Sequence, residues 1–304
     1  MKKQTENTDK ITDMFNSGRF WYNHSNARKE EGIYGGRNMK LRSSIRRIDS
    51  PAGRMKILIL RPEKQEGPVP GILWLHGGGY VTGMASMVYI TAGSTLAKHF
   101  GTVLIAPEYR RALRNPYPAA LEDCYAALEY LYSHADELGV DRNRIVVGGE
   151  SAGGGLAAAV CLLARDEGEI PVSFQLPLYP MLDCDDTESS RHSHSHGWGT
   201  RRNHWAWRKY LGDLYGTDEV PPYASPAKET NYAGLPPCYT FVEDEEPFLA
   251  ETVAYIQNLK DAGVEAHMDI YHGNIHGFDT MRWTKNAKEA RRKLLKAAEK
   301  YLKL

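Results

Sequence analysis

Short apolar runs rich in β-branched and aromatic residues alternate along the chain with longer stretches in which apolar residues recur every three or four positions. The short runs predict β-strands and the longer stretches predict amphipathic helices. Residues 44–60 read SIRRIDSPAGRMKILIL, which predicts two strands around a Ser-Pro-Ala-Gly turn. Further strands are predicted at residues 71–75, 102–106, 144–148, 172–178, 238–242 and 266–271.

Helical patterns fill the gaps between these strands. Residues 248–263, for example, show helical spacing at Leu249, Thr252, Tyr255, Ile256 and Leu259. Strands that alternate with helices predict an α/β fold with a mainly parallel sheet covered on both faces. The predicted helices are residues 86–100, 118–138, 151–168, 248–263 and 286–304.

Two segments interrupt this alternation, residues 1 to about 42 and roughly residues 185–222, of which the second is rich in His, Trp and Arg. The sequence contains no internal repeat and no low-complexity linker. We therefore expect a single domain over residues 1–304, with the two segments folded over its body as a cap.

The charges of the chain cancel, because 38 Lys and Arg residues balance 38 Asp and Glu residues. This argues against nucleic acid or an anionic membrane as a partner and favours a small molecule. The polar N-terminus MKKQTENTDK lacks the apolar core of a signal peptide, and GLAAAVCLLA is too short to span a bilayer, so we expect a cytoplasmic protein. Four scattered cysteines without a CxxC pair predict reduced thiols that pack in the core.

The stretch VVGGESAGGG, residues 146–155, places one serine among glycines between a predicted strand and a predicted helix. Residues 149–153 match G-x-S-x-G, the nucleophile elbow, in which small neighbours let Ser151 adopt a strained turn with an exposed hydroxyl. The N–H of Ala152, at the start of the helix, is the natural donor to an oxyanion. A glycine-rich turn that only packs tightly is the alternative.

The same glycines offer a second interpretation, because Gly153, Gly155 and Ala158 fit G-x-G-x-x-A. A dinucleotide fingerprint needs its first glycine directly after the strand, whereas this one lies inside the start of the helix. The pattern therefore favours the nucleophile elbow.

A second glycine motif, LWLHGGGYV at residues 73–81, lies at the end of the third predicted strand. His76, Gly77, Gly78 and Gly79 form an HGGG loop, whose backbone N–H groups supply the rest of an oxyanion hole. We expect His76 itself to be a structural hydrogen-bonding residue rather than a base.

A serine hydroxyl becomes a nucleophile only when a base takes its proton and a carboxylate orients that base. His276, in YHGNIHGFD after the last predicted strand, is the preferred base, and His272 is its competitor. Glu246 is the preferred acid, because Pro247 is expected to open the next helix and to leave Glu246 extended at the end of the loop. Asp244 stays a rival.

Taken together, HGGGY, GESAGG, PEYRRALRNPYPAALEDC, EEPF and HGF resemble the hormone-sensitive-lipase-like family of α/β-hydrolases, the family IV bacterial carboxylesterases. The resemblance runs from about Ile45 to the C-terminus. It implies an α/β-hydrolase fold with an eight-stranded, mostly parallel sheet flanked by helices, a helical cap, and no metal or other cofactor. The implied roles are nucleophile for Ser151, base for His276, acid for Glu246, and oxyanion donors for Gly77, Gly78 and Ala152.

The chain departs from the family pattern in three places. Glu150 and Glu246 stand where the family usually has Asp, and Arg-Ala-Leu-Arg-Asn at residues 111–115 replaces Leu-Ala-Pro-Glu-His. The longer Glu246 side chain requires a slightly withdrawn backbone and keeps Asp244 as a rival. The altered run affects loop packing rather than the chemistry.

The expected activity is hydrolysis of a small-molecule, short-acyl carboxylic ester through an acyl-enzyme intermediate. An amidase or peptidase with the same groups and a non-catalytic receptor of the same fold stay open as alternatives, and so does a homodimer.

Two further features fall in the predicted cap. Residues 191–204, RHSHSHGWGTRRNH, contain four histidines, but their Ser and Gly spacing and the lack of a carboxylate cluster predict a solvated loop rather than a metal site. The aromatic residues of the cap offer surface to an acyl or alcohol group, and most are expected to attach the cap to the body. The histidines are His192, His194, His196 and His204, and the aromatic residues are Phe15, Phe20, Trp21, Tyr22, Trp198, Trp205, Trp207, Tyr210 and Tyr215.

Overall fold

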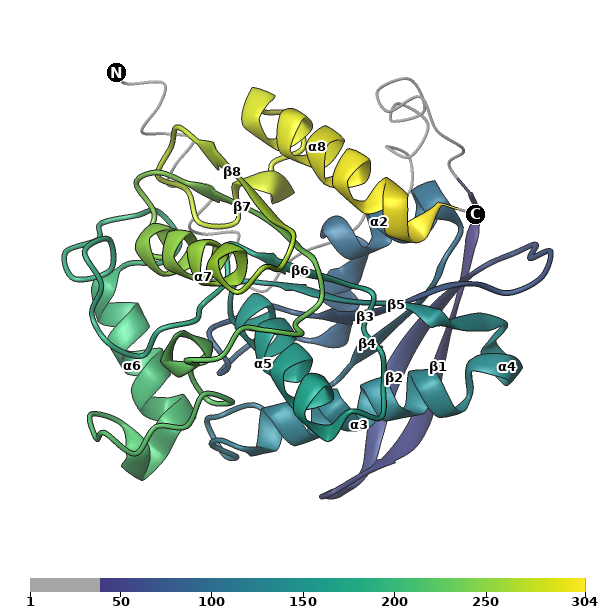
Figure 1. The fold of residues 1–304 in the computed structure, drawn as a ribbon, viewed down its shortest axis with the longest axis horizontal. Helices are drawn as coiled ribbons and strands as arrows, with labels where there is room; N and C mark the ends of the chain where they lie inside the picture. The colour runs from purple at the N-terminus through teal and green to yellow at the C-terminus, as the bar shows by residue number, and fades with distance from the viewer. Residues whose placement is uncertain (1–38, 304) are drawn as a thin grey trace. The chain divides into compact units, whose positions relative to one another are not determined.

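An eight-stranded sheet in the order β1-β2-β4-β3-β5-β6-β7-β8 forms the centre of the fold (Figure 1). The computed structural model describes residues 39–303, so the cap contribution predicted for residues 1–38 lies outside the described residues. The strands are β1 (Leu41–Ser50), β2 (Gly53–Pro62), β3 (Val69–Leu75), β4 (Val103–Pro107), β5 (Val140–Glu150), β6 (Phe174–Leu178), β7 (Cys238–Glu243) and β8 (Ala266–Tyr271).

The pairing of the strands matches the prediction of a mostly parallel sheet. β1 and β2 form the antiparallel hairpin expected from residues 44–60, and β2 is also antiparallel to β4. All the other neighbouring strands are parallel. β1 begins at Leu41, next to the bound of about residue 42 expected for the first interrupting segment.

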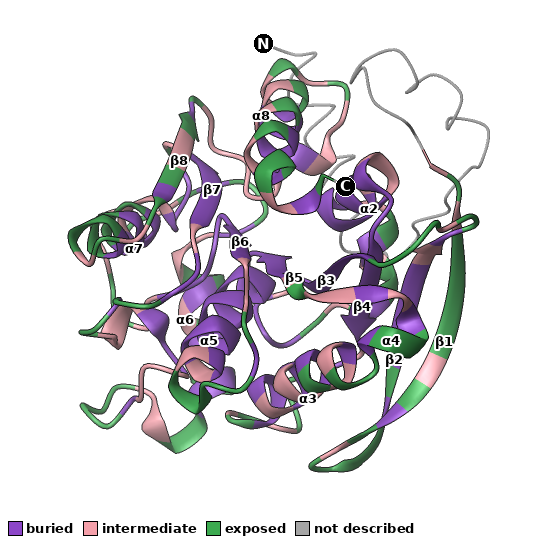
Figure 2. Ribbon diagram, turned by 45° about the vertical axis from the view of Figure 1, so that its right-hand side comes forward, coloured by how far each residue is buried: buried purple, intermediate pink, exposed green. Residues whose placement is uncertain are grey.

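Helices cover the sheet on both faces (Figure 1). α2 (Ala92–Phe100) and α8 (Lys285–Leu302) lie on one face, and α3 (Ala119–Ser133) and α5 (Ala152–Glu167) lie on the other. α7 (Leu249–Asp261) packs beside β7 and β8. Because the central strands are covered from both sides, β3, β4, β6 and β7 are buried along their whole length, whereas β1 at the edge is largely exposed (Figure 2).

Two predicted helices are each divided in the structure. Residues 86–100 form a 3₁₀ helix, η2 (Ala85–Tyr89), followed by α2, because β-branched Thr91 adopts an extended backbone as the N-cap of α2. Residues 118–138 form α3 and the short α4 (Ala135–Leu138), which meet at His134. There the Ser133 hydroxyl donates to the Glu129 carbonyl at 2.7 Å, and such local side-chain bonds compete with helix continuation.

The second interrupting segment contains α6 (Thr200–Leu211) and a short 3₁₀ helix, η3 (Gly212–Leu214). Its aromatic residues Trp207 and Tyr210 are buried, and the Tyr80 ring stacks on Tyr210 with centroids 3.9 Å apart. The N–H of Tyr117 also donates to the Tyr210 carbonyl at 2.7 Å. These residues attach the segment to the body, as predicted, whereas Trp205 is exposed.

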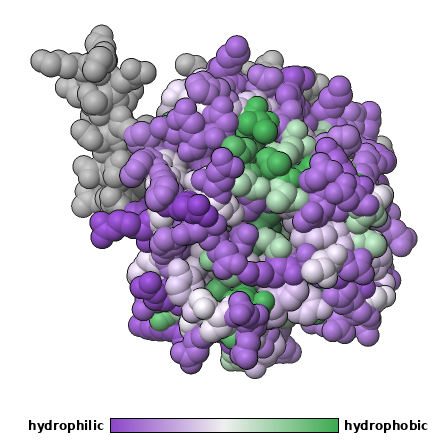
Figure 3. Space-filling model, turned by 60° about the vertical axis from the view of Figure 1, so that its left-hand side comes forward, coloured by the Kyte–Doolittle hydropathy of each residue, from purple (hydrophilic) through white to green (hydrophobic). Residues whose placement is uncertain are grey.

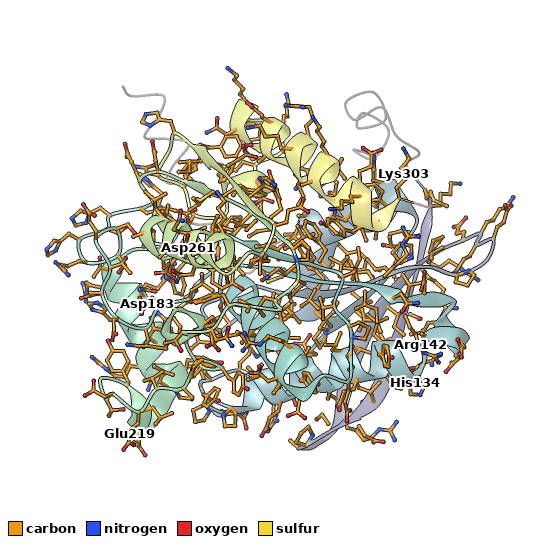
Figure 4. The ribbon with its side chains drawn as sticks, in the orientation of Figure 1. His134, Arg142, Asp183, Glu219, Asp261 and Lys303 are labelled. Atoms are coloured by element: carbon orange, nitrogen blue, oxygen red, sulfur yellow. The ribbon has the colours of Figure 1, made fainter. Side chains whose placement is uncertain are left out.

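The segment that contains α6 lies on the side of the sheet where the parallel strands end. Arg142, near the start of β5, and Asp183, which follows β6, lie on opposite sides of the molecule, and α6 is on the Asp183 side (Figure 4). The glycine motifs that follow β3 and β5 emerge at this same edge. Figure 3 turns this side toward the viewer and shows hydrophobic residues gathered among hydrophilic ones.

Within residues 39–303, no helix combines the length and the apolar content that crossing a membrane would require.

Candidate active site

Ser151 alone forms the turn between β5 and α5, since β5 ends at Glu150 and α5 begins at Ala152. Its φ of 58° and ψ of −122° lie outside the regions that L-residues favour, which costs about 1–3 kcal/mol. Two backbone hydrogen bonds of 3.0 Å hold the turn, one from Ser151 N–H to the Leu178 carbonyl and one from Met181 N–H to the Ser151 carbonyl. The elbow predicted from GESAGG is therefore anchored to the end of β6.

The turn also touches the HGGG loop through backbone atoms. A Cβ added to Gly153 would lie 2.1 Å from the Leu75 carbonyl oxygen and 2.5 Å from that of His76. Any side chain at position 153 would push these segments apart, so this close approach requires glycine. The glycines of the elbow thus serve contact between two loops as well as the turn itself.

Three side chains from separate loops form one hydrogen-bonded chain at the turn. His276 Nε2 lies 2.7 Å from Ser151 Oγ, and His276 Nδ1 lies 2.5 Å from Glu246 Oε2. The Glu246 side chain is fully buried and that of His276 is largely buried. Because a carboxylate can only accept, Nδ1 carries the proton toward Glu246, and Nε2 is left to accept the proton of the serine hydroxyl.

The loop after β7 fixes Glu246 in place. The N–H of Glu243 donates to the second carboxylate oxygen, Glu246 Oε1, at 3.1 Å. The expectation that Pro247 opens the next helix is wrong by two residues, because α7 begins at Leu249 after a turn. The hydrogen bond from Glu243 N–H holds this carboxylate, whose other oxygen meets His276.

The two rival residues pair with each other instead. His272 Nδ1 lies 3.1 Å from Asp244 Oδ2, and the N–H of Gly273 donates to Asp244 Oδ1 at 3.0 Å. This N–H and the His272 ring lower the pKa of Asp244, and the hydrogen bond to Asp244 raises the pKa of His272. Both side chains are exposed, so this pair lies on the surface beside the buried one.

Two of the predicted oxyanion donors, Gly77 and Ala152, lie beside the same serine. A Cβ added to Gly77 would lie 3.3 Å from Ser151 Cβ, so the HGGG loop runs directly beside the turn, with Gly78 next along it. Ala152 is the first residue of α5, where a backbone N–H has no acceptor within the helix. The N–H groups of Val81 and Thr82 both donate to the Gly78 carbonyl, at 3.1 and 3.0 Å, and close the loop.

His76 supports this loop. It is buried, its Nδ1 lies 2.8 Å from the Gly77 carbonyl oxygen, and its ring stacks on Tyr109 at 4.0 Å. Burial lowers the pKa of His76 to about 4, which keeps the ring neutral at physiological pH. A neutral, buried imidazole that bonds to the backbone fits the structural role expected from the sequence.

Aromatic rings surround His276 on several sides. The ring centroids of Phe248, Tyr179 and Trp198 lie 5.0, 5.2 and 6.2 Å from that of the imidazole. The motifs did not single out Tyr179 and Phe248, although each occupies a position that indicates a place near the site. Tyr179 directly follows β6, and Phe248 ends the EEPF motif.

The histidine-rich segment holds the loop that carries His276. His196 N–H donates to the Asn274 carbonyl at 2.8 Å, and His276 N–H donates to the His196 carbonyl at 3.0 Å. The prediction of a solvated loop thus describes the exposed side chains of His192, His194 and His196 but not the backbone, which is paired.

Side chains close enough to hold a metal ion form two groups among the described residues. One consists of Asp183, Cys184 and Asp185, and the other of Asp244, Glu245 and His272. None of the four histidines of residues 191–204 belongs to either group. His204 instead pairs with Asp186, with 2.6 Å between Nε2 and Oδ1.

A second buried carboxyl group, that of Glu150, precedes the serine. The indole N–H of Trp74 donates to both of its oxygens, at 2.9 and 3.0 Å. Burial, with the nearby charge of Asp279, raises the pKa of Glu150 to about 8. The Glu that replaces the Asp typical of the family is therefore buried next to the serine, with a raised pKa.

Comparison with known proteins identifies the family of the chain. A family described as having the alpha/beta hydrolase fold matches residues 72–280. Esterase LipI and carboxylic ester hydrolase LipN, both of Mycobacterium tuberculosis, are 32% and 34% identical over 240 and 239 residues; each match covers 76% of this chain, and 73% and 62% of the relatives. The structure of a bacterial heroin esterase superposes with a TM-score of 0.81 at 35% identity, covering 86% of this chain and 85% of that one.

Proposed function

The chain belongs to the α/β hydrolase family, among its hormone-sensitive-lipase-like carboxylesterases, and from this premise we propose that it hydrolyses short-acyl carboxylic esters at Ser151. One observation carries the proposal. The Ser151 hydroxyl, on a strained turn, lies within hydrogen-bond distance of an imidazole whose other nitrogen meets a buried carboxylate. Nucleophilic acyl transfer needs such a hydroxyl, base and orienting acid in this order.

In the proposed mechanism His276 removes the proton of Ser151 as the oxygen attacks the ester carbonyl carbon. The carbonyl oxygen becomes an oxyanion, which the N–H groups of Gly77, Gly78 and Ala152 stabilise. His276 then gives its proton to the leaving alcohol, and an acyl group stays on Ser151. Water attacks this acyl-enzyme with His276 again as base, and the acid is released.

Glu246 acts through His276 in this scheme. Its buried carboxylate accepts from Nδ1–H, which fixes the tautomer and stabilises the imidazolium that forms during attack. The Phe248 and Tyr179 rings pack around the same imidazole and limit its contact with water. Both features favour a base that keeps one orientation through the two half-reactions.

The proposed roles can be tested with p-nitrophenyl acetate. We expect Ser151→Ala to lower kcat/KM on the order of a million-fold, as loss of a triad nucleophile does. Ser133→Ala, which removes an exposed hydroxyl at the end of α3, is the matched control and should leave kcat/KM unchanged. A fluorophosphonate adduct found by mass spectrometry on any residue other than Ser151 would contradict the proposal.

Ester and amide substrates distinguish the enzyme from an amidase or peptidase. We expect p-nitrophenyl acetate to be hydrolysed far faster than p-nitroacetanilide, because p-nitrophenolate leaves without a proton whereas the anilide nitrogen must be protonated as it leaves. Once a fluorophosphonate has been shown to label Ser151, hydrolysis of either substrate would exclude the receptor alternative. Faster cleavage of the anilide would overturn the esterase assignment.

We further propose that residues 185–222 act as the cap over this site and that the enzyme works in the cytoplasm. Buried Trp207 and Tyr210 attach residues 185–222 to the body, which supports the role of a cap. For the cytoplasmic location, Cys124, Cys161 and Cys238 are buried as free thiols in the core, which suits a reducing compartment. A homodimer stays a prediction that size-exclusion chromatography with light scattering tests.

A further inference from the structure

Trp198 reaches the site from the segment that precedes α6. A Cβ added to Gly79 would lie 2.1 Å from Trp198 Cη2, and the indole centroid lies 6.2 Å from that of His276. The side chain is nearly buried, with 8% of it exposed. The indole therefore packs against the far end of the HGGG loop and lies next to the base.

Neighbouring residues hold this ring in one position. The indole N–H donates to Asn203 Oδ1 at 3.2 Å, and Asn203 is itself buried on α6. The Arg202 guanidinium lies 5.7 Å from the ring centroid, and its NH1 donates to the Gly197 carbonyl at 2.6 Å. These two contacts hold the indole in one orientation.

The chemistry of ester cleavage decides which part of the substrate meets this indole. The oxygen of the leaving alcohol must lie near His276 Nε2 to receive its proton, so the alcohol group is placed on the imidazole side. The acyl group points away from the imidazole, since the oxyanion and Ser151 Oγ occupy the remaining directions around the carbon. Trp198 lies on the imidazole side, and it therefore meets the alcohol group.

We propose that Trp198 sets the upper size limit for the alcohol group of the ester. The inference rests on the proposed esterase function and adds to it the residue that selects the alcohol. If Trp198 only attached the cap, its removal would lower stability and would affect kcat/KM for all esters alike. If Trp198 limits the size of the alcohol group, its removal would change the ranking of substrates by kcat/KM.

The test compares two ester series by titrating the acid that is released. The alcohol series is ethyl, n-butyl and cyclohexyl acetate, whose leaving groups have similar basicity, and the acyl series is ethyl acetate, butyrate and hexanoate. For Trp198→Ala we expect the ratio of kcat/KM for cyclohexyl acetate to that for ethyl acetate to rise roughly ten-fold or more, since removing bulk from a pocket changes discrimination by this order. The ranking of the acyl series should stay as it is.

Two further variants keep the test decisive. Trp205→Ala removes an exposed indole from α6 and should leave both rankings unchanged. Trp198→Phe retains a smaller aromatic ring and should shift the alcohol ranking in the same direction as Trp198→Ala, but by less. If Trp198→Ala does not fold, Trp198→Phe takes its place in the test. An unchanged alcohol ranking in these variants, or a shift confined to the acyl series, would overturn the proposal.

The outcome also separates this inference from the proposed function. Labelling of Ser151 by a fluorophosphonate measures the active fraction of each variant without reference to alcohol size. If Ser151 is not labelled in the unmodified protein, the esterase proposal fails. If Ser151 is labelled and the protein hydrolyses ethyl acetate, but substitution of Trp198 leaves the alcohol ranking unchanged, only the inference about Trp198 fails.

Discussion

Two histidine–carboxylate pairs lie side by side at the end of the sheet, built from the same two loops. His276 pairs with Glu246 and His272 pairs with Asp244, so each loop contributes one partner to each pair. The side chains of the first pair are 10% and 0% exposed, and those of the second are 85% and 38% exposed. Only the buried pair continues to a serine, through the 2.7 Å contact between His276 Nε2 and Ser151 Oγ.

The difference shows that pairing alone does not create a site. An exposed ion pair contributes little because water screens its charges. The buried pair lies among aromatic rings, where a hydrogen bond has greater electrostatic effect and the imidazole has one orientation. We attribute function to His276 and Glu246 because burial and the adjacent hydroxyl add what the surface pair lacks.

The largest expected effect separates the two histidines. His276→Ala should reduce kcat for p-nitrophenyl acetate on the order of a million-fold, because the base and its proton relay are lost together. His272→Ala should stay within about 2-fold, as for an ordinary surface substitution. Comparable losses in the two variants, measured on protein with matching circular dichroism spectra, would abolish the distinction between the pairs.

A smaller effect is expected for the acids. Glu246→Gln should lower kcat on the order of ten-thousand-fold and leave a measurable remnant, because the amide favours the wrong imidazole tautomer. Asp244→Asn keeps an oxygen that can accept from Gly273 N–H and should change kcat little. If Asp244→Asn proved the more damaging change in steady-state kinetics, Asp244 would be the functional acid.

Glu150 offers a third case beside the two pairs, because its carboxyl group is buried but bonds to the Trp74 indole rather than to a histidine. Its folded-state pKa of about 8 lies above the ordinary 4.5, so between these pH values the folded protein keeps a proton that the unfolded chain has released. Its contribution to stability therefore falls as pH rises through this range. Between pH 5 and pH 8 the melting temperature should fall in both proteins. We expect the fall in Glu150→Gln to be smaller than that in the unmodified protein by roughly 5 °C.

Asp279 provides a check on that measurement. It is buried near Glu150, and burial raises its pKa as well, so part of the pH dependence should remain in the variant. Calorimetric scans in which both proteins lose the same stability between pH 5 and pH 8 would mean that Glu150 is ionised in the folded state.

The smallest effect concerns the surface pair itself. The hydrogen bond to Asp244 raises the pKa of His272, so this pair favours the folded state below that pKa and loses its effect as pH rises through it. In an NMR titration, Asp244→Asn should bring the His272 pKa down toward its ordinary value while kcat stays unchanged. A titration curve that does not move would show that the surface pair is not formed in solution.

The sequence predicted the strands and the turns more reliably than the contacts among loops. GESAGG and HGGG each follow a buried strand, and strand ends in a parallel sheet meet at one edge, so their proximity could be inferred from order alone. The preference for His276 over His272 followed from its place late in the chain and farther from the end of the last strand, but nothing in YHGNIHGFD says which ring is buried. That depends on His196, whose backbone pairs with the loop from about 80 residues upstream.

By itself the sequence determined the alternation of strands and helices, the strained position of Ser151 and the order of the three polar residues, because these depend on local spacing and backbone conformation. The tertiary structure alone decided that Glu246 rather than Asp244 meets His276, and that Trp198 lies against Gly79. Both outcomes arise from packing between segments far apart in the chain, where burial and excluded volume select one partner among several that local chemistry would allow.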